Sequence, residues 1–160
     1  MNRIAQFFKV SLDEYLRGGS REEFESISLP RRATKGSAGY DFYAPKDIFL
    51  ASEETVKVAT GIRVKIDEGW VLKIYPRSSL GFKYRLTLNN TVGIIDSDYY
   101  YADNEGHIFI KMTNLGKEPL FIKKGSAFAQ GVFVEYGITL DDEPVTDLRK
   151  GGFGSTDKKV

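Results

Sequence analysis

The sequence predicts an all-β fold, a sandwich, jelly roll or barrel built from many short strands. Apolar and charged residues alternate along the chain far more often than they follow a helical stripe, as in the run from Ile62 to Ile66. Turn signals such as Asp67-Glu68-Gly69 separate these runs at short intervals. Many short strands in succession are typical of these three architectures.

Eight segments have the alternation or the apolar character of a half-buried strand. In chain order they are Gln6 to Val10, Tyr40 to Tyr43, Val56 to Val58, Ile62 to Ile66, Trp70 to Tyr75, Ile108 to Met112, Leu120 to Lys123 and Ala127 to Tyr136. One segment departs from this pattern. Ser11-Leu12-Asp13-Glu14 has the spacing of a capping box and Gly18-Gly19 is a stop signal, so we expect a short helix near the N-terminus.

The composition narrows the class of protein. A chain of 160 residues is expected to form one domain with a sufficient core of its own. It has no cysteine, which excludes disulfides and thiolate zinc sites. Its net charge of +1 gives no electrostatic reason for binding nucleic acid or an acidic membrane. Because no apolar run is long enough to span a bilayer, we expect a cytoplasmic protein without membrane contact.

Three stretches inside the chain carry polar groups that a plain sheet does not need. Asp41 lies in the aromatic stretch SAGYDFYA, where a carboxylate is costly unless it has a partner or faces water at an edge. YPRSSLG packs a guanidinium beside two hydroxyls, which suits phosphate oxygens but also describes a serine-rich turn. NNTVGIIDSDY ends a buried strand at Asp96, a position for a base that holds a water, although Asp-Ser-Asp is also a common turn.

A fourth stretch, RKGGFGST, lies a few residues before the end of the chain. Its three glycines free the backbone N–H groups to turn inward, and its arginine, serine and threonine add donors for phosphate. It is not a P-loop, because the GxxxxGK[ST] spacing is missing. The alternative is a glycine-rich tail, but the phenylalanine at its centre counts against pure disorder.

Taken together, these stretches resemble the five ordered motifs of the trimeric dUTPase family, the enzymes that hydrolyse dUTP to dUMP and pyrophosphate. AGYDFYA is similar to the first motif, PRSSLG to the second, NNTVGIIDSDY to the third, GSAFAQGVF to the fourth and RKGGFGST to the fifth. The order and spacing cover residues from about Pro30 to Thr156. The resemblance implies a distorted β-jelly-roll homotrimer whose three active sites are shared between subunits. Its reaction keeps uracil out of DNA and supplies dUMP.

The resemblance also implies a division of the chain and a role for each motif. Residues 1–148 form the β domain, and residues 149–160 form an arm that closes over a neighbour's site and that we expect to be mobile without ligand. Asp96 matches the catalytic aspartate, which activates a water for attack on the α-phosphorus of dUTP. Asp41 matches the aspartate that acts through water on the Mg²⁺ bridging the phosphates. The implied substrate-binding residues are Arg77, Ser78, Ser79, Asn90, Gly93, Ile95, Tyr99, Gln130, Arg149, Phe153, Gly154, Ser155 and Thr156.

Within that set, the resemblance gives each part of the substrate its own residues. Arg77, the two serines after it and Gln130 are expected to hold the phosphates. Asn90 lies in the hairpin that is expected to read the uracil, and Tyr99 is expected to pack against the deoxyribose and exclude a 2′-hydroxyl. Phe153 is expected to stack on the base while Arg149 and the hydroxyls of the arm clamp the γ-phosphate.

The sequence departs from the family pattern at five places, one of which is that Arg149 stands closer to the paired glycines than the family's arginine does. Ala127 stands where the family has an arginine, and Asp157 follows the serine and threonine of the last motif where the family has glycine; we expect Asp157 to face solvent. The segment Tyr101 to Glu105 is an insertion, and the N-terminal helix is also extra, so both are either oligomer contacts or decoration. His107, the only histidine, matches no catalytic position, and a structural role is favoured.

Two other functions are compatible with this fold. A dCTP deaminase has a similar arginine-serine motif, but it needs a glutamate beside the base, and IIDSDY matches the hydrolase better. A non-catalytic scaffold or regulator of the same fold is the second alternative. The presence of Asp96, Tyr99, Arg77 and Gln130 argues for an active enzyme.

Overall fold

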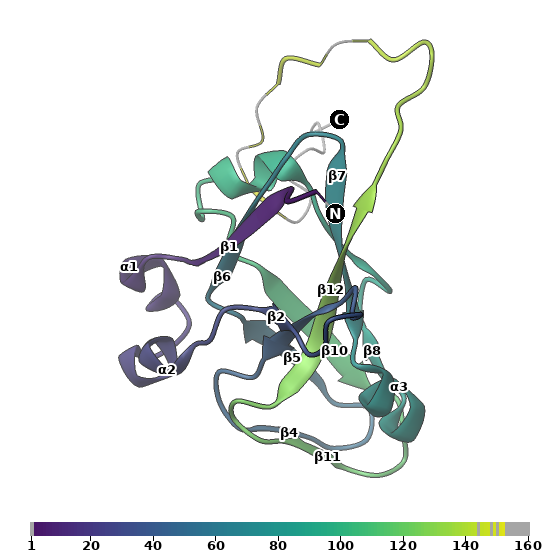
Figure 1. The fold of residues 1–160 in the computed structure, drawn as a ribbon. Coiled ribbons are helices and arrows are strands. Elements are labelled where there is room, and N and C mark those ends of the chain that lie inside the picture. Colours follow the sequence, from purple (N-terminus) through teal and green to yellow (C-terminus); the bar gives the residue numbers. More distant parts are fainter. Residues whose placement is uncertain (1, 144, 148, 150, 153–160) are drawn as a thin grey trace, which may run out of the picture.

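The computed structural model describes residues 2–143, 145–147, 149, 151 and 152. It confirms the all-β fold (Figure 1). The elements in chain order are β1 (Ala5–Lys9), α1 (Leu12–Tyr15), α2 (Arg21–Ser26), β2 (Arg31–Arg32), β3 (Tyr40–Tyr43), β4 (Ile48–Leu50), β5 (Thr55–Ala59), β6 (Ile62–Ile66), β7 (Trp70–Pro76), α3 (Ser78–Tyr84), β8 (Leu86–Leu88), β9 (Gly93–Ile95), the 3-10 helix η1 (Ser97–Tyr101), β10 (Phe109–Asn114), β11 (Leu120–Ile122) and β12 (Ala127–Glu135).

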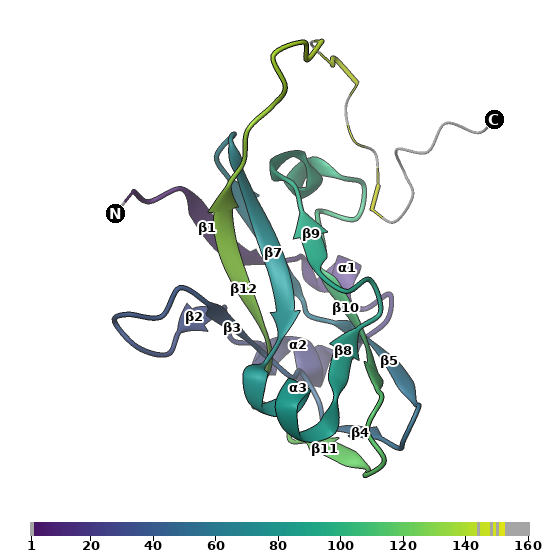
Figure 2. The same ribbon diagram turned by 90° about the vertical axis from the view of Figure 1, so that its right-hand side faces the viewer.

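The strands form small antiparallel sheets around one core. The five-stranded sheet has the order β2-β3-β12-β7-β9, and a three-stranded sheet has the order β5-β10-β8. Two ribbons, β1-β6 and β4-β11, complete the arrangement. The long strand β12 runs along the molecule in both views (Figures 1 and 2). Alternate residues of the strands point inward, and Phe42, Leu72, Ile110 and Phe128 are among the fully buried side chains.

Strands with clear alternation lie where the sequence predicts them, but two short helices were missed. The helix α1 begins after Ser11, whose hydroxyl accepts from the Glu14 N–H at 3.1 Å. The complete capping box belongs instead to α2, where Ser20 and Glu23 cap each other. The serine-rich turn expected after Tyr75 is the start of α3. That helix carries Gly81 and has no side-chain cap, so no helical signal marks it.

The register of β7 and β9 separates the segments that follow them. Ile95 of β9 pairs with Leu72, and Gly93 pairs with Ile74, so the two strands run in opposite directions. The helix α3 therefore follows β7 at one end of the molecule and η1 follows β9 at the other (Figure 2). Arg77 lies five residues beyond Leu72 along β7, and an extended strand of that length spans roughly 16 Å.

The chain after β12 returns to the η1 end. In Figure 1 it arches over the top of the molecule, and Arg149 contacts the segment that begins η1. Phe153, Gly154, Ser155, Thr156 and Asp157 lie outside the described residues, as do Leu148 and Lys150. In the part of the chain that the structure describes, no helix is long and apolar enough to cross a membrane.

Candidate active site

A pocket of about 220 Å³ opens beside β9 and η1. Five of the residues predicted to bind substrate line it together: Asn90, Gly93, Ile95, Tyr99 and Arg149. The remaining lining is mostly apolar and was not predicted: Ile74, Leu88, Val92, Ile94, Phe109, Ile110 and Gly152. Sites for small molecules commonly have volumes of about 300–1,000 Å³. This pocket is therefore sized for part of a nucleotide, such as a base with its sugar.

The wall of the pocket depends on close packing of β9 against β7. A Cβ atom on Gly93 would lie 2.9 Å from Cβ of Ile74, closer than side-chain carbons approach one another. Glycine at this position lets the two strands pair. In a sequence, a glycine inside an apolar strand often marks such a close approach of two backbones. The preceding turn is tight, because Thr91 has φ 66° and the Val92 N–H donates to the Asn90 carbonyl at 2.7 Å.

Tyr99 closes one side of the pocket and is almost fully buried. Its hydroxyl donates to the His107 carbonyl at 2.7 Å and accepts from Nδ2 of Asn104 at 2.9 Å. Burial raises the pKa of the phenol above its ordinary value of 10.0, while the Asn104 hydrogen bond opposes the shift. Tyr99 is therefore a neutral, doubly hydrogen-bonded ring at neutral pH.

Asp96 does not line the pocket itself, but it directly follows Ile95 and contacts Arg149, which both do, and its side chain is 45% exposed. Nη2 of Arg149 lies 2.6 Å from Oδ2 of Asp96, and Nε lies 3.0 Å from Oδ1 of Asp98. Arg149 thus bridges two carboxylates of the third motif, and neighbouring Gly152 lies beside the Tyr99 ring. The described residues of the arm, Arg149 and Gly152, line the pocket of their own chain. Closure of the arm over a neighbour's site stays a prediction.

A second polar cluster lies at the α3 end. Nη1 of Arg77 is 2.5 Å from Oδ2 of Asp41, which is buried, so the expectation of a water-facing edge residue is excluded. Strand pairing brings Gln130 opposite both Asp41 and Tyr75, and its Nε2 lies 3.4 Å from the Pro76 carbonyl. An open hollow is lined here by Tyr75, Pro76, Arg77, Ser78, Gly81, Phe82 and Gln130. Ser79 is exposed beside it.

The pocket and the hollow do not share a lining residue. The structure therefore sorts the predicted site into two groups. One group, at the η1 end of the folded molecule, holds Asp96, Tyr99 and the uracil hairpin. The other group, at the α3 end, holds Asp41, Arg77, Ser78 and Gln130. Among the described residues, His, Asp and Glu form no group of three or more that could hold a metal ion.

A family model, a curated relative and a solved structure all match this chain and point to one family. The family model described as dUTPase matches residues 25–157. A curated relative, the deoxyuridine 5'-triphosphate nucleotidohydrolase of Lactococcus lactis subsp. lactis (strain IL1403), is 43% identical over 132 residues, which cover 81% of this chain and 88% of the relative. The crystal structure of dUTPase from Streptococcus mutans aligns with a TM-score of 0.66 at 33% identity and covers 86% of this chain and 98% of that chain.

More distant structures share the fold. A mutant dUTPase from phage phi11 of S. aureus, described with a structural Mg(II) ion, has a TM-score of 0.65 at 22% identity. The match covers 91% of this chain and 98% of that chain. At that identity the likeness shows the architecture alone.

Proposed function

Because this chain belongs to the dUTPase family and hydrolyses dUTP to dUMP and pyrophosphate, we propose that it does so at a site completed by two subunits. The pocket beside Tyr99 and Asp96 of one chain would bind the nucleoside. The cluster of Asp41, Arg77 and Gln130 from another chain would bind the phosphates. We place this activity in the cytoplasm.

The base and sugar fit the pocket by its chemistry. The turn from Asn90 to Gly93 supplies backbone donors and acceptors, and the apolar lining suits the faces of a pyrimidine. The Tyr99 ring also lines the pocket, where it would pack on the deoxyribose. A ribose would need room for one more hydroxyl at this wall.

Asp96 is the residue that carries the chemistry in this proposal. Its carboxylate is exposed enough to hold a water. The water would attack the α-phosphorus in line with the departing pyrophosphate. The contact with Arg149 is one that substrate phosphates would replace, since a guanidinium binds phosphate as it binds carboxylate.

The phosphates would lie against the second cluster, where the guanidinium of Arg77, the hydroxyls of Ser78 and Ser79 and the amide of Gln130 are donors. The described residues fit a Mg²⁺ that the triphosphate itself carries, since this ion is commonly bound by substrate phosphates with one or two carboxylates. Asp41 would hold it through water. The ion would supply neutralising charge to the phosphates.

One observation carries the proposal of a shared site, and it is the register of β7 and β9. The strands β7 and β9 are antiparallel, and Arg77 follows the first while Asp96 follows the second. The two residues therefore lie at opposite ends of the folded molecule. A triphosphate bound at the Asp96 pocket therefore needs the Arg77 cluster of another copy. Closed cyclic symmetry would repeat the contact, and a homotrimer with three equivalent sites is the assembly we propose.

The substitution Asp96→Asn tests the catalytic role. We expect the turnover of dUTP to fall roughly 10²- to 10⁴-fold, as on loss of a positioned base, with binding of a non-hydrolysable dUTP analogue retained. Asp98→Asn is the matched control, because Asp98 shares Arg149 and is similarly exposed but is not assigned the water. Near-normal turnover of Asp96→Asn, or an equal loss in the control, would remove Asp96 from this role.

A further inference from the structure

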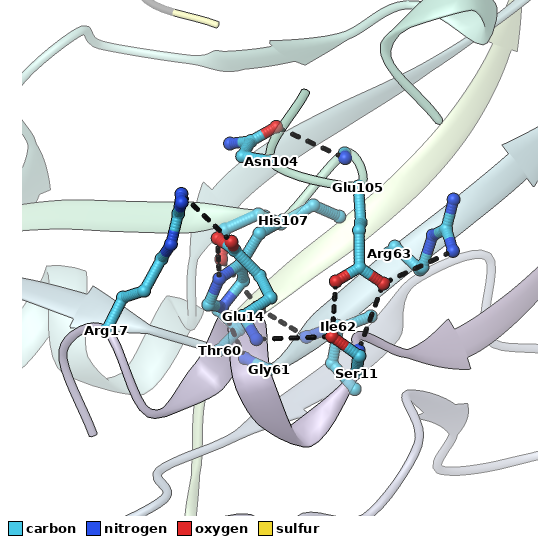
Figure 3. Close-up of polar contacts among 12 residues, drawn as sticks. Ser11, Glu14, Arg17, Thr60, Gly61, Ile62, Arg63, Asn104, Glu105 and His107 are labelled. Atoms are coloured by element: carbon cyan, nitrogen blue, oxygen red, sulfur yellow. Dashed lines mark hydrogen bonds and ion pairs between the residues drawn. The ribbon is translucent and has the colours of Figure 1, made fainter. Parts of the chain in front are cut away.

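Two segments that the family motifs do not explain, the N-terminal helix α1 and the insertion Tyr101 to Glu105, pack against each other. The Ser11 that caps α1 contacts Glu105 twice, since its N–H donates to Oε1 at 3.1 Å and its hydroxyl donates to Oε2 at 2.5 Å. Arg63 of β6 lies 3.7 Å from the same carboxylate (Figure 3). The start of α1 therefore fixes the tip of the insertion.

The backbone of the insertion turns back sharply toward η1. Glu105 and Gly106 both have positive φ, 60° and 71°. A Cβ atom on Gly106 would lie 2.6 Å from the Tyr99 carbonyl oxygen, so the loop folds directly back onto Tyr99. Arg63 also donates to the Tyr100 carbonyl at 2.7 Å, and this bond holds the start of the loop.

A buried pair behind the loop fixes His107, the residue where the insertion rejoins the sheet. Nε2 of His107 accepts the Gly61 N–H at 2.9 Å, so the ring proton is on Nδ1, which lies 3.3 Å from Oε1 of Glu14 (Figure 3). Glu14 is only 8% exposed and His107 only 1%. Arg17 adds an ion pair to the second Glu14 oxygen at 3.4 Å. The expected structural role of His107 agrees with this position.

Both hydrogen bonds of the Tyr99 hydroxyl come from this braced loop. The His107 carbonyl accepts the phenol proton, and Nδ2 of Asn104 donates to the phenol oxygen. The same Asn104 side chain accepts the Gly106 N–H at 3.2 Å, so it joins the loop backbone to the phenol. Displacement of the loop would therefore remove both anchors of Tyr99 at once.

We propose that Asn104 and the Glu14–His107 pair are positioning residues for Tyr99, through which α1 and the insertion set the discrimination between deoxyribose and ribose. This inference rests on the proposed function, in which the Tyr99 ring meets the sugar. Rejecting one additional hydroxyl requires the ring to be held to within about 0.5 Å, a tolerance that second contacts behind the ring must provide. The phenol is held from behind by the two hydrogen bonds, while its ring faces the pocket.

The test compares kcat/KM for dUTP with kcat/KM for UTP in the full chain. For Asn104→Ala we expect the dUTP preference to fall roughly 2- to 12-fold, the equivalent of one net hydrogen bond. Asn104→Asp keeps the acceptor for the Gly106 N–H and loses the donor to Tyr99, so it should lose the same preference while keeping the loop. Tyr99→Phe also removes the hydrogen bond to the His107 carbonyl, so it should lower the preference at least as far as the Asn104 variants do. Adding Asn104→Ala to Tyr99→Phe should change the preference little, because the bond between Asn104 and the phenol is already lost.

The helix is tested with Glu14→Gln and Glu14→Ala. The amide can still accept from His107, so Glu14→Gln should change the preference less than Glu14→Ala does. The matched control is Asp13→Ala, since Asp13 is exposed on the same helix. It should leave the preference unchanged.

Two outcomes would overturn the inference. In one, the Asn104 variants lower the melting temperature but keep the parental preference for dUTP, which is what a purely structural loop predicts. In the other, the losses from Asn104→Ala and Tyr99→Phe add fully. The proposed function fails separately, because only that failure would leave Tyr99→Ala rejecting UTP as strongly as the parent does.

Discussion

Acidification should destabilise this protein through one residue, His107. Protonating the ring at Nε2 would place a second N–H against the Gly61 N–H that this nitrogen now accepts. Burial lowers the pKa of His107 below its ordinary 6.5, and hydrogen bonding and charge from Glu14 partly oppose the shift. Glu105 also raises the pKa and Lys57 lowers it, while Arg17 offsets the charge of Glu14.

The sign and the limit of the effect follow from proton linkage. Below pH 6.5 the unfolded chain binds a proton that the folded chain still excludes, so the free energy of unfolding falls as the pH falls. The stabilisation is complete above pH 6.5 and is lost progressively toward the lower pKa of the folded state. One proton limits the slope to about 1.4 kcal/mol per pH unit. Breaking the Gly61 hydrogen bond is part of this cost, since protonation of Nε2 leaves a buried donor without an acceptor, which typically costs about 1–3 kcal/mol.

Urea denaturation from pH 5 to 8 measures this slope, and His107→Gln is the matched variant. Its side-chain oxygen can still accept the Gly61 N–H, but it cannot be protonated in this range. Because the chain has a single histidine, NMR of the untagged protein gives one imidazole titration to compare. Parallel loss of stability in the parent and His107→Gln, or an imidazole that titrates at or above 6.5, would refute the reasoning.

Three further predictions concern the pocket and the arm. Tyr99→Ala should raise kcat/KM for UTP relative to dUTP, and an unchanged ratio would mean that another residue selects the sugar. Gly93→Ala should cost about 1–3 kcal/mol of stability by overpacking against Ile74 and should weaken binding of a dUTP analogue; calorimetry that finds both unchanged would contradict this. A chain ending at Leu148 should fold but hydrolyse dUTP far more slowly, and Phe153→Ala should do less harm, about 1–3 kcal/mol for a base–aromatic stack. Full activity of the truncated chain would make the arm a simple tail.

Much of the sheet could be predicted because alternation is a local signal. The run from Ile62 to Ile66 became β6, and the segment from Tyr40 to Tyr43 became β3 with the same bounds. The short strands β4 and β8 and the helix α3 were missed, because three to seven residues leave too little pattern. The helix α2 is different, since its capping box was present in the sequence at Ser20 and Glu23.

For the site, the motifs predicted residues but not their geometry. Asn90, Gly93 and Tyr99 meet in one pocket as the resemblance implied. That Asp96 and Arg77 lie at opposite ends depends on strand register, which is set by long-range pairing. The contact of Glu14 with His107 joins residues 93 positions apart, and no local pattern connects them. The roles given to Phe153 and the residues after it stay predictions.

The most direct test of the shared site is complementation between two inactive variants. Asp96→Asn and Arg77→Ala are each purified, then mixed in equal amounts, dissociated and reassembled. If Asp96 and Arg77 act from different subunits of a homotrimer, random mixing gives about one quarter of the sites an intact pair, and dUTP hydrolysis should return to about that fraction. If each chain builds its whole site alone, the mixture will stay as inactive as its components.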